Sequence, residues 1–141
     1  MSGADTSPDV PAKTPTAPLL RVGRFELWQP TAADHQALHA LTLDPAMRRF
    51  LGQHEPDPAD SFARLFRNAG SWALHGYGTF MVRTKGERKI IANSGVFRSW
   101  RGISGLDDVP EAGWIVHRDW WGKGVASGTG RRSTCRAISG P

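Results

Sequence analysis

A glycine-rich turn near the end of the chain carries the clearest chemical signal. The apolar run at residues 114–116 leads into the string WGKGVA at residues 121–126. Glycines allow a backbone to approach a ligand closely and leave successive N–H groups exposed, and a following helix adds the positive end of its dipole. Lys123 contributes a full positive charge. This combination predicts a cradle for a pyrophosphate group.

Two familiar phosphate-binding loops do not fit this turn. A Walker loop requires the string GxxxxGK[ST], which the sequence does not contain. A dinucleotide-binding fingerprint lies after the first strand of a βαβ unit and needs a glycine or alanine where this chain has Ser127. A plain strand-to-helix turn, in which glycine only relieves backbone strain, remains the simpler alternative.

The residues ahead of this turn must supply the elements that position it. Alternating polar and apolar residues predict a half-buried strand over residues 24–30. Thr31, followed three residues later by Asp34, is typical of a helix start, and an apolar stripe continues that helix to residue 44. Residues 44–52 predict one or two further helical turns.

The strongest helix prediction begins at Asp57. An aspartate at the N-cap, Pro58 at the first helical position and Asp60 in the first turn all favour a helix start, and Gly76 marks its end. Apolar residues recur at helical spacing between these points, and we expect them to pack against a sheet. The predicted buried stripe is Phe62, Leu65, Phe66, Ala69 and Ala73.

Three strand-like runs complete the pattern. Residues 78–84 and 89–100 flank a short polar connection and predict a hairpin. Residues 111–117 form a short apolar run that is typical of a central strand. The order strand, helix, helix, strand, strand, strand predicts an α/β (α+β) fold, with a mixed, mostly antiparallel sheet flanked by helices.

Composition limits the remaining possibilities. A chain of 141 residues with 39% hydrophobic content fits one small domain, preceded at residues 1–20 by a Pro/Ser/Thr-rich tail that we expect to be disordered. The sequence shows neither a secretory signal nor a membrane span, so we expect a cytoplasmic protein. The single Cys135 excludes an internal disulfide. We expect no metal site, because His35 and His39 have a suitable spacing but lack an HExxH context.

The net charge of +5 and the pI near 10.1 raise the question of nucleic-acid binding. The basic residues are interleaved with acidic ones, and three arginines fall in the last eleven residues (Arg131, Arg132 and Arg136). We therefore regard nucleic acid as an unlikely partner. A basic module that binds nucleic acid through arginines and the six tryptophans is the least favoured alternative.

The string WGKGVA resembles the acetyl-CoA loop of the GNAT superfamily, whose pattern is Gln/Arg-x-x-Gly-x-Gly/Ala. Gly124 and Ala126 fit the fourth and sixth places, whereas Trp121 departs from the consensus in the first place. With this tryptophan, the string resembles the loop of the RimJ/RimL-type N-terminal acetyltransferases of ribosomal proteins. Residues 24–52, 71–82 and 110–127 resemble, in order, the family's opening strand and helices, its second strand, and its fourth strand with the loop. The resemblance covers about residues 21–127.

This resemblance implies an acetyl-CoA-dependent N-acetyltransferase that acts on a primary amine, for which a protein N-terminus is one candidate. The pantetheine arm would bond to the backbone of the strand at 114–116, and the loop amides would hold the pyrophosphate. Glu111 matches the acidic place of the family's E-x-G-W pattern and is our candidate base, acting directly or through water; the alternative is a surface carboxylate at the strand's start. The candidate coenzyme-binding residues are Trp114, Ile115, Val116, Trp121, Gly122, Lys123, Gly124, Val125 and Ala126.

Residues 128–141 depart from the family pattern. They are rich in Arg, Gly and Ser and predict an irregular tail in place of an amphipathic helix and further strands. No candidate for the general acid remains. We therefore expect a domain that is incomplete at its C-terminal end, through truncation or a frameshift, with the strand at 111–117 as an exposed edge that favours oligomers. The alternative function is a catalytically incomplete GNAT remnant, with or without CoA binding.

Overall fold

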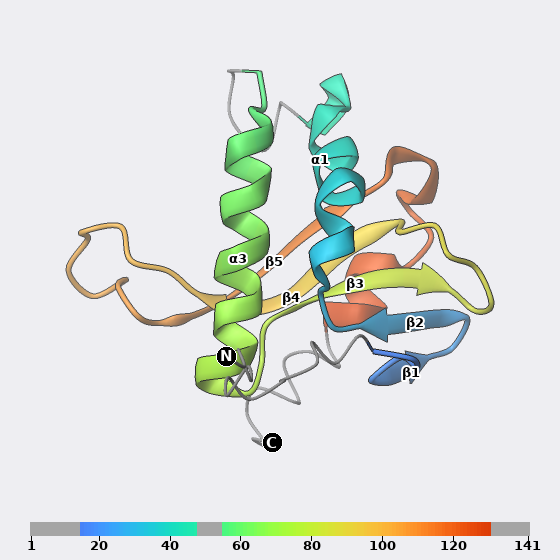
Figure 1. Ribbon diagram of the computed structural model, residues 1–141, viewed down its shortest axis with the longest axis horizontal. Coiled ribbons are helices and arrows are strands. Elements are labelled where there is room, and N and C mark those ends of the chain that lie inside the picture. The colour runs from blue at the N-terminus through green and yellow to red at the C-terminus, as the bar shows by residue number, and fades with distance from the viewer. Residues whose placement is uncertain (1–14, 48–54, 131–141) are drawn as a thin grey trace, which may run out of the picture.

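The computed structural model describes residues 15–47 and 55–130, which form a sheet with helices on both faces (Figure 1). The strands are β1 (Leu20–Val22), β2 (Phe25–Trp28), β3 (Thr79–Thr84), β4 (Ala92–Arg98) and β5 (Pro110–Val116). The helices are α1 (His35–Leu43) and α3 (Pro58–His75), with short 3-10 helices at Ala32–Asp34 and Arg118–Trp120. Residues 45–47 and 125–130 are also helical.

The five strands lie in the order β1-β2-β3-β4-β5, and each pairs antiparallel with the next. This confirms the predicted mixed α/β fold with an antiparallel sheet. The strand β1 was not predicted, and its first residue, Leu20, falls in the stretch that we expected to be a disordered tail. Among the described strands, β5 forms one edge of the sheet.

Two apolar clusters cover the two faces of the sheet. Alternation along β3 divides them, because Phe80 and Val82 face one cluster while Met81 faces the other. The helices α1 and α3 lie side by side over the Met81 face, and Val125 brings the helical residues 125–130 onto the opposite face (Figure 1). The sheet therefore separates α1 and α3 from the segment that follows the glycine-rich turn.

The ends of α3 agree with the sequence prediction. The Asp57 carboxylate accepts a hydrogen bond from the Ala59 N–H at 2.9 Å, which satisfies one of the unpaired donors of the first turn. Gly76 adopts the left-handed conformation at φ 75° and donates its N–H to the carbonyl of Trp72 at 3.1 Å. Both signals are local, so they could be read without knowing how the helix packs.

The predicted buried stripe of α3 is wrong except at Leu65, which is buried. Phe62 and Phe66 are 49% and 60% exposed. The buried face instead carries polar residues, because the Asn68 side chain hydrogen-bonds both the N–H and the carbonyl of Thr79, at 2.6 and 3.0 Å. The buried residues of α3 are Ser61, Leu65, Asn68 and Ser71. Hydrogen bonding to the start of β3, rather than hydrophobicity alone, sets the orientation of this helix.

Some expectations concern residues at the limits of the described chain. Residues 1–14, 48–54 and 131–141 lie outside it, including Cys135 and the three arginines near the C-terminus. Residues 128–130 are helical, so the described helix extends three residues into the stretch that we expected to be irregular. Within the described ranges, no helix has the length and apolar character needed to cross a membrane.

Candidate functional site

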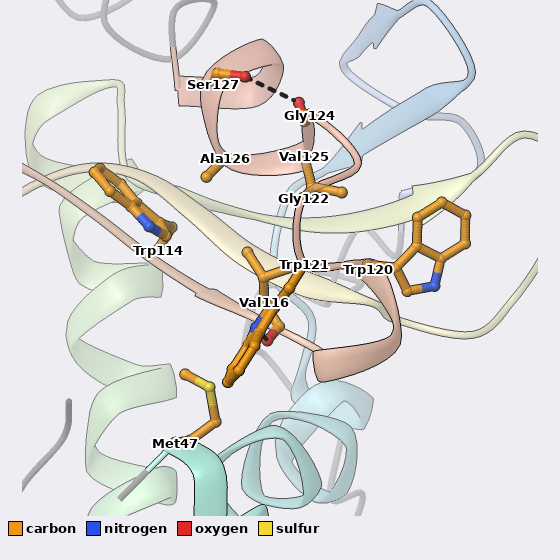
Figure 2. Close-up of a pocket in the computed structure, with 10 residues that line it drawn as sticks. All are labelled: Met47, Trp114, Val116, Trp120, Trp121, Gly122, Gly124, Val125, Ala126 and Ser127. Carbon is orange, nitrogen blue, oxygen red and sulfur yellow. Dashed lines mark hydrogen bonds between the residues drawn. The ribbon is translucent and has the colours of Figure 1, made fainter. Parts of the chain in front are cut away.

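A pocket of about 530 Å³ lies where the outer edge of β5 meets the glycine-rich turn (Figure 2). The helical residues 45–47 contribute one wall, and the first turn of the helix at 125–130 contributes another. Most of the lining is apolar or aromatic. The lining residues are Met47, Trp114, Val116, Trp120, Trp121, Gly122, Gly124, Val125, Ala126 and Ser127.

Seven of the nine candidate coenzyme residues line this pocket. The other two are Ile115, whose side chain is buried in the cluster under α1 and α3, and Lys123, whose ammonium lies 5.3 Å from the centroid of the Trp120 ring. Sequence analysis did not identify Met47, Trp120 or Ser127 as lining residues. Trp120 and Ser127 flank the recognised string directly, whereas Met47 reaches the pocket only through the tertiary fold.

The backbone of the turn is shaped for close approach by a ligand. Gly122 and Gly124 have φ values of 73° and 80°, a region that residues with a Cβ rarely adopt. A Cβ placed on Gly122 would meet no atom within 4 Å, so the space above the turn is open. Gly128 donates to the Gly124 carbonyl at 2.9 Å, so the N–H groups of residues 125–127 precede the first helical hydrogen bond. These donors suit a pyrophosphate.

The outer edge of β5 offers backbone groups to the same pocket. The His117 N–H donates to the Ile91 carbonyl at 2.8 Å, which fixes the alternation along the strand. In an antiparallel pair only every second residue bonds to the neighbouring strand, so the N–H and carbonyl groups of Trp114 and Val116 point to the open edge. The Val116 carbonyl accepts a hydrogen bond from the Trp121 indole at 2.7 Å.

The tryptophan rings give the pocket its apolar character. Figure 2 shows the Trp121 ring extending from the turn toward Met47. Trp114 is 56% exposed and projects from the same face of the sheet as Val116. A large, half-exposed aromatic side chain beside open strand-edge groups is suited to cover an extended, mostly apolar ligand arm.

Glu111 lies at the opposite end of β5 and does not line the pocket. Its carboxylate forms a two-pronged ion pair with the Arg101 guanidinium, at 2.7 and 2.8 Å, and accepts a hydrogen bond from the Ser99 hydroxyl at 2.7 Å. The bond from Arg101 first, and that from Ser99 second, lower the pKa of Glu111. Glu111 and Val116 are five residue steps apart along the extended strand, which is roughly 17 Å.

The two histidines at metal-compatible spacing bond to α3 instead. A ring nitrogen of His35 lies 3.0 Å from the Pro58 carbonyl oxygen, and one of His39 lies 2.9 Å from the Ser61 hydroxyl. These contacts tie α1 to the first turn of α3. Residues 15–47 and 55–130 contain no group of three or more His, Cys, Asp or Glu side chains placed to hold a metal ion.

Comparisons with known proteins agree with this geometry. Residues 24–137 match the family model described as the acetyltransferase (GNAT) domain. A GNAT-family acetyltransferase from Bordetella pertussis has a similar structure (TM-score 0.71, 21% identity), with 85% of this chain and 72% of that chain covered. An acetyltransferase from Agrobacterium tumefaciens str. C58 gives a TM-score of 0.70 at 19% identity, with 91% and 72% covered.

A GNAT-family acetyltransferase from Bacillus anthracis gives a TM-score of 0.61 at 19% identity, with 83% of this chain and 63% of that chain covered. At these identities the likeness shows a shared fold, whereas the family match spans most of the chain. The chain therefore belongs to the GNAT acetyltransferase family, whose fold and domain imply acyl transfer from acetyl-CoA.

Proposed function

We propose that this protein is an acetyl-CoA-dependent N-acetyltransferase that acts on a primary amine. One observation carries the proposal: the open edge of β5, the glycine-rich turn and the first residues of the helix that follows it line a single pocket of about 530 Å³. The two sets of groups suit two chemically different parts of one ligand. The turn suits a pyrophosphate, and the strand edge suits an arm that carries amide groups.

In this proposal, the N–H groups of Gly122 and of residues 124–126 hold the pyrophosphate of the coenzyme. The Lys123 N–H instead donates to the Trp120 carbonyl at 3.3 Å. The pantetheine amides pair with the outward backbone groups of Trp114 and with the Val116 N–H, as an added strand would. The Trp121 indole already occupies the Val116 carbonyl. Val125 and Ala126 supply small apolar side chains beside the arm. The thioester would then lie toward the Glu111 end of β5.

The reaction requires a neutral amine. Its nitrogen forms a bond to the thioester carbonyl carbon, the carbon–sulfur bond breaks, and the sulfur leaves as a thiolate that takes up a proton. The protein aligns the two reactants and accepts the proton that the ammonium gives up. Glu111 remains our candidate for that step, acting directly or through a water molecule.

The contacts of Glu111 favour the indirect route. Arg101 and Ser99 lower its pKa, so the carboxylate is charged at neutral pH but weakly basic. A weakly basic carboxylate can attract the ammonium and orient a water molecule, and the water then carries the proton away. The same contacts would suit the surface carboxylate of a catalytically incomplete relative, which is the second candidate function. We assign no general acid among the described residues.

Acceptor identity rests on one sequence feature. The tryptophan in the first place of the loop resembles the RimJ/RimL-type branch, which favours a protein N-terminus as the amine. Incubation of the full chain with acetyl-CoA and peptides bearing free N-termini, beside a set of small amines, tests this choice. Acetylation confined to the small amines would remove the protein N-terminus as the acceptor.

Titration calorimetry of the full chain with acetyl-CoA tests the coenzyme site itself. We expect micromolar binding that a Gly124→Trp variant loses, because an indole at this position would enter the pocket and force a left-handed backbone on a bulky residue. Binding without product formation from any amine would support the incomplete relative. Folded protein that does not bind acetyl-CoA would refute the proposed function.

A further inference from the structure

A single arginine from the beginning of the fold reaches the glycine-rich turn near its end. Arg24 precedes β2, and its guanidinium donates a hydrogen bond to the backbone carbonyl of Lys123 at 2.9 Å. The same guanidinium lies 5.4 Å from the centroid of the Trp120 ring and 5.1 Å from that of Phe25. These two rings meet edge to face at 5.9 Å, so the guanidinium lies against a prebuilt aromatic surface.

The bond to Lys123 constrains a peptide unit that would otherwise be loosely held. Lys123 lies between Gly122 and Gly124, both in the left-handed region, and glycine allows many other backbone conformations at little cost. The Lys123 carbonyl and the Gly124 N–H belong to one planar trans peptide, so they point in opposite directions. By holding the carbonyl, Arg24 fixes the direction of the Gly124 N–H.

We propose that Arg24 is the positioning residue of the coenzyme loop, an inference that rests on the proposed function of this pocket. Gly124 lines the pocket, and its N–H lies on the side of the peptide away from Arg24. If this peptide flipped, the Lys123 carbonyl oxygen would face the pyrophosphate in place of a donor. Arg24 therefore keeps a hydrogen-bond donor, rather than an acceptor, directed at the phosphates.

The geometry also explains why an arginine suits this role better than a lysine. The planar guanidinium can stack on the Trp120 ring and donate in its own plane at the same time, which an ammonium cannot do. The Lys123 ammonium also lies near this ring, at 5.3 Å from the centroid of Trp120. The Trp120 ring thus contacts both Arg24 and Lys123, the two residues that the hydrogen bond joins.

Three variants of the full chain test the role of Arg24. Arg24→Met removes both the donor and the charge but keeps an unbranched side chain, and Arg24→Lys restores the charge and one flexible donor. Arg88→Met, in the connection between β3 and β4, removes a comparable exposed arginine away from the pocket. Binding of coenzyme A and of dephospho-coenzyme A, which differ by one phosphate, is measured by calorimetry, with thermal unfolding as the check on folding.

We expect Arg24→Met to weaken both ligands about tenfold, Arg24→Lys to recover part of that loss, and Arg88→Met to leave binding unchanged. An equal loss for the two ligands is the mark of a positioning role. A loss confined to coenzyme A would show that Arg24 contacts the additional phosphate that dephospho-coenzyme A lacks, which would overturn the proposal. Unchanged affinity in Arg24→Met would overturn it as well.

Hydrogen exchange separates this inference from the proposed function. In Arg24→Met without ligand, we expect faster exchange of the hydrogen-bonded loop amides of Lys123 and Gly128, which donate to the carbonyls of Trp120 and Gly124, while the amides of β3 and β4 keep their protection. If the wild-type protein binds no acetyl-CoA but Arg24→Met shows this faster exchange, the proposed function fails while the role of Arg24 in holding the loop is supported. If the loop amides exchange as in the wild type, Arg24 does not hold the loop and the inference fails.

Discussion

The indole N–H of Trp121 donates to the backbone carbonyl of Val116 at 2.7 Å, and this bond joins the two halves of the pocket. Val116 belongs to the strand edge, and Trp121 opens the glycine-rich turn. The bond also uses the one outward carbonyl nearest the turn. The pantetheine arm can therefore accept a hydrogen bond from the Val116 N–H, but the first outward carbonyl left for it is that of Trp114.

Trp121→Phe removes this bond and keeps most of the ring. We expect acetyl-CoA to bind about three- to tenfold more weakly, because the hydrogen bond that holds the turn against the edge of β5 is lost and the Val116 carbonyl loses its donor. Titration calorimetry measures the change. Trp100→Phe is the matched control, since Trp100 is 78% exposed on the β4–β5 connection. Tighter binding by Trp121→Phe would mean that the indole competes with the coenzyme.

The ion pair between Arg101 and Glu111 predicts a specific pH dependence of stability. Because the folded protein lowers the pKa of Glu111, its contribution to the free energy of unfolding is present above the unfolded pKa and is lost as the pH falls through the folded pKa. We expect Glu111→Gln to be less stable than the wild type at neutral pH, with the difference shrinking as the pH falls through the lowered pKa of Glu111 and disappearing once the carboxylate is protonated. Urea unfolding over a series of pH values from neutral to acid measures it.

Glu111→Gln also bears on the reaction. If the charged carboxylate attracts the ammonium, the variant should raise the KM for the amine while the affinity for acetyl-CoA stays unchanged, since Glu111 does not line the pocket. A stability difference that persists unchanged at low pH would contradict the assignment of the ion pair. An unchanged KM and kcat would leave Glu111 with a structural role only.

Truncation of Asn68 should lower the free energy of unfolding more than truncation of Phe66, two residues away on α3. Side-chain hydrophobicity alone would predict the reverse. Asn68→Ala leaves the buried N–H of Thr79 without its acceptor and leaves the Thr79 carbonyl with the Trp72 indole as its side-chain donor, which we expect to cost about 2 to 3 kcal/mol. Phe66→Ala should cost under about 1 kcal/mol, because this ring is 60% exposed. Urea unfolding of the two variants gives the comparison, and a larger loss for Phe66→Ala would contradict the observed packing.

This contrast shows which parts of the fold the sequence could predict. The ends of α3 depend on Asp57 and Gly76, whose effects are local, and both were identified correctly. The buried face depends on Asn68 meeting Thr79, eleven residues away, and no periodicity of apolar residues reports such a bond. The short strand β1 was missed because three residues show too little alternation, and it is held by pairing with β2.

The site divides in the same way. The turn at residues 121–126 was visible because closely spaced glycines have few structural uses, and left-handed φ values at Gly122 and Gly124 now account for both. The hydrogen bond from Arg24 to Lys123 could not be predicted from the sequence, since the two residues are 99 positions apart and arginines are common on surfaces. Contacts between distant segments decide how the loop is held, whereas local sequence decides that it exists.

The open edge of β5 predicts self-association that the coenzyme should suppress. Outward N–H and carbonyl groups of Ala112 and Trp114 form a template for a second strand, and within the described residues no strand covers them. We expect the mean mass from light scattering to rise with protein concentration and to fall when acetyl-CoA is added, because the pantetheine arm would occupy the same groups.

A proline provides the matched test of this edge. Ala112→Pro removes one outward N–H without removing a bond to β4, and proline is tolerated in edge strands, so the variant should associate less. Ala112→Val keeps the N–H and should associate like the wild type. A wild-type protein that remains monomeric at high concentration would contradict association through this edge. Association that acetyl-CoA leaves unchanged would place the contact between copies elsewhere on the surface, away from the pocket.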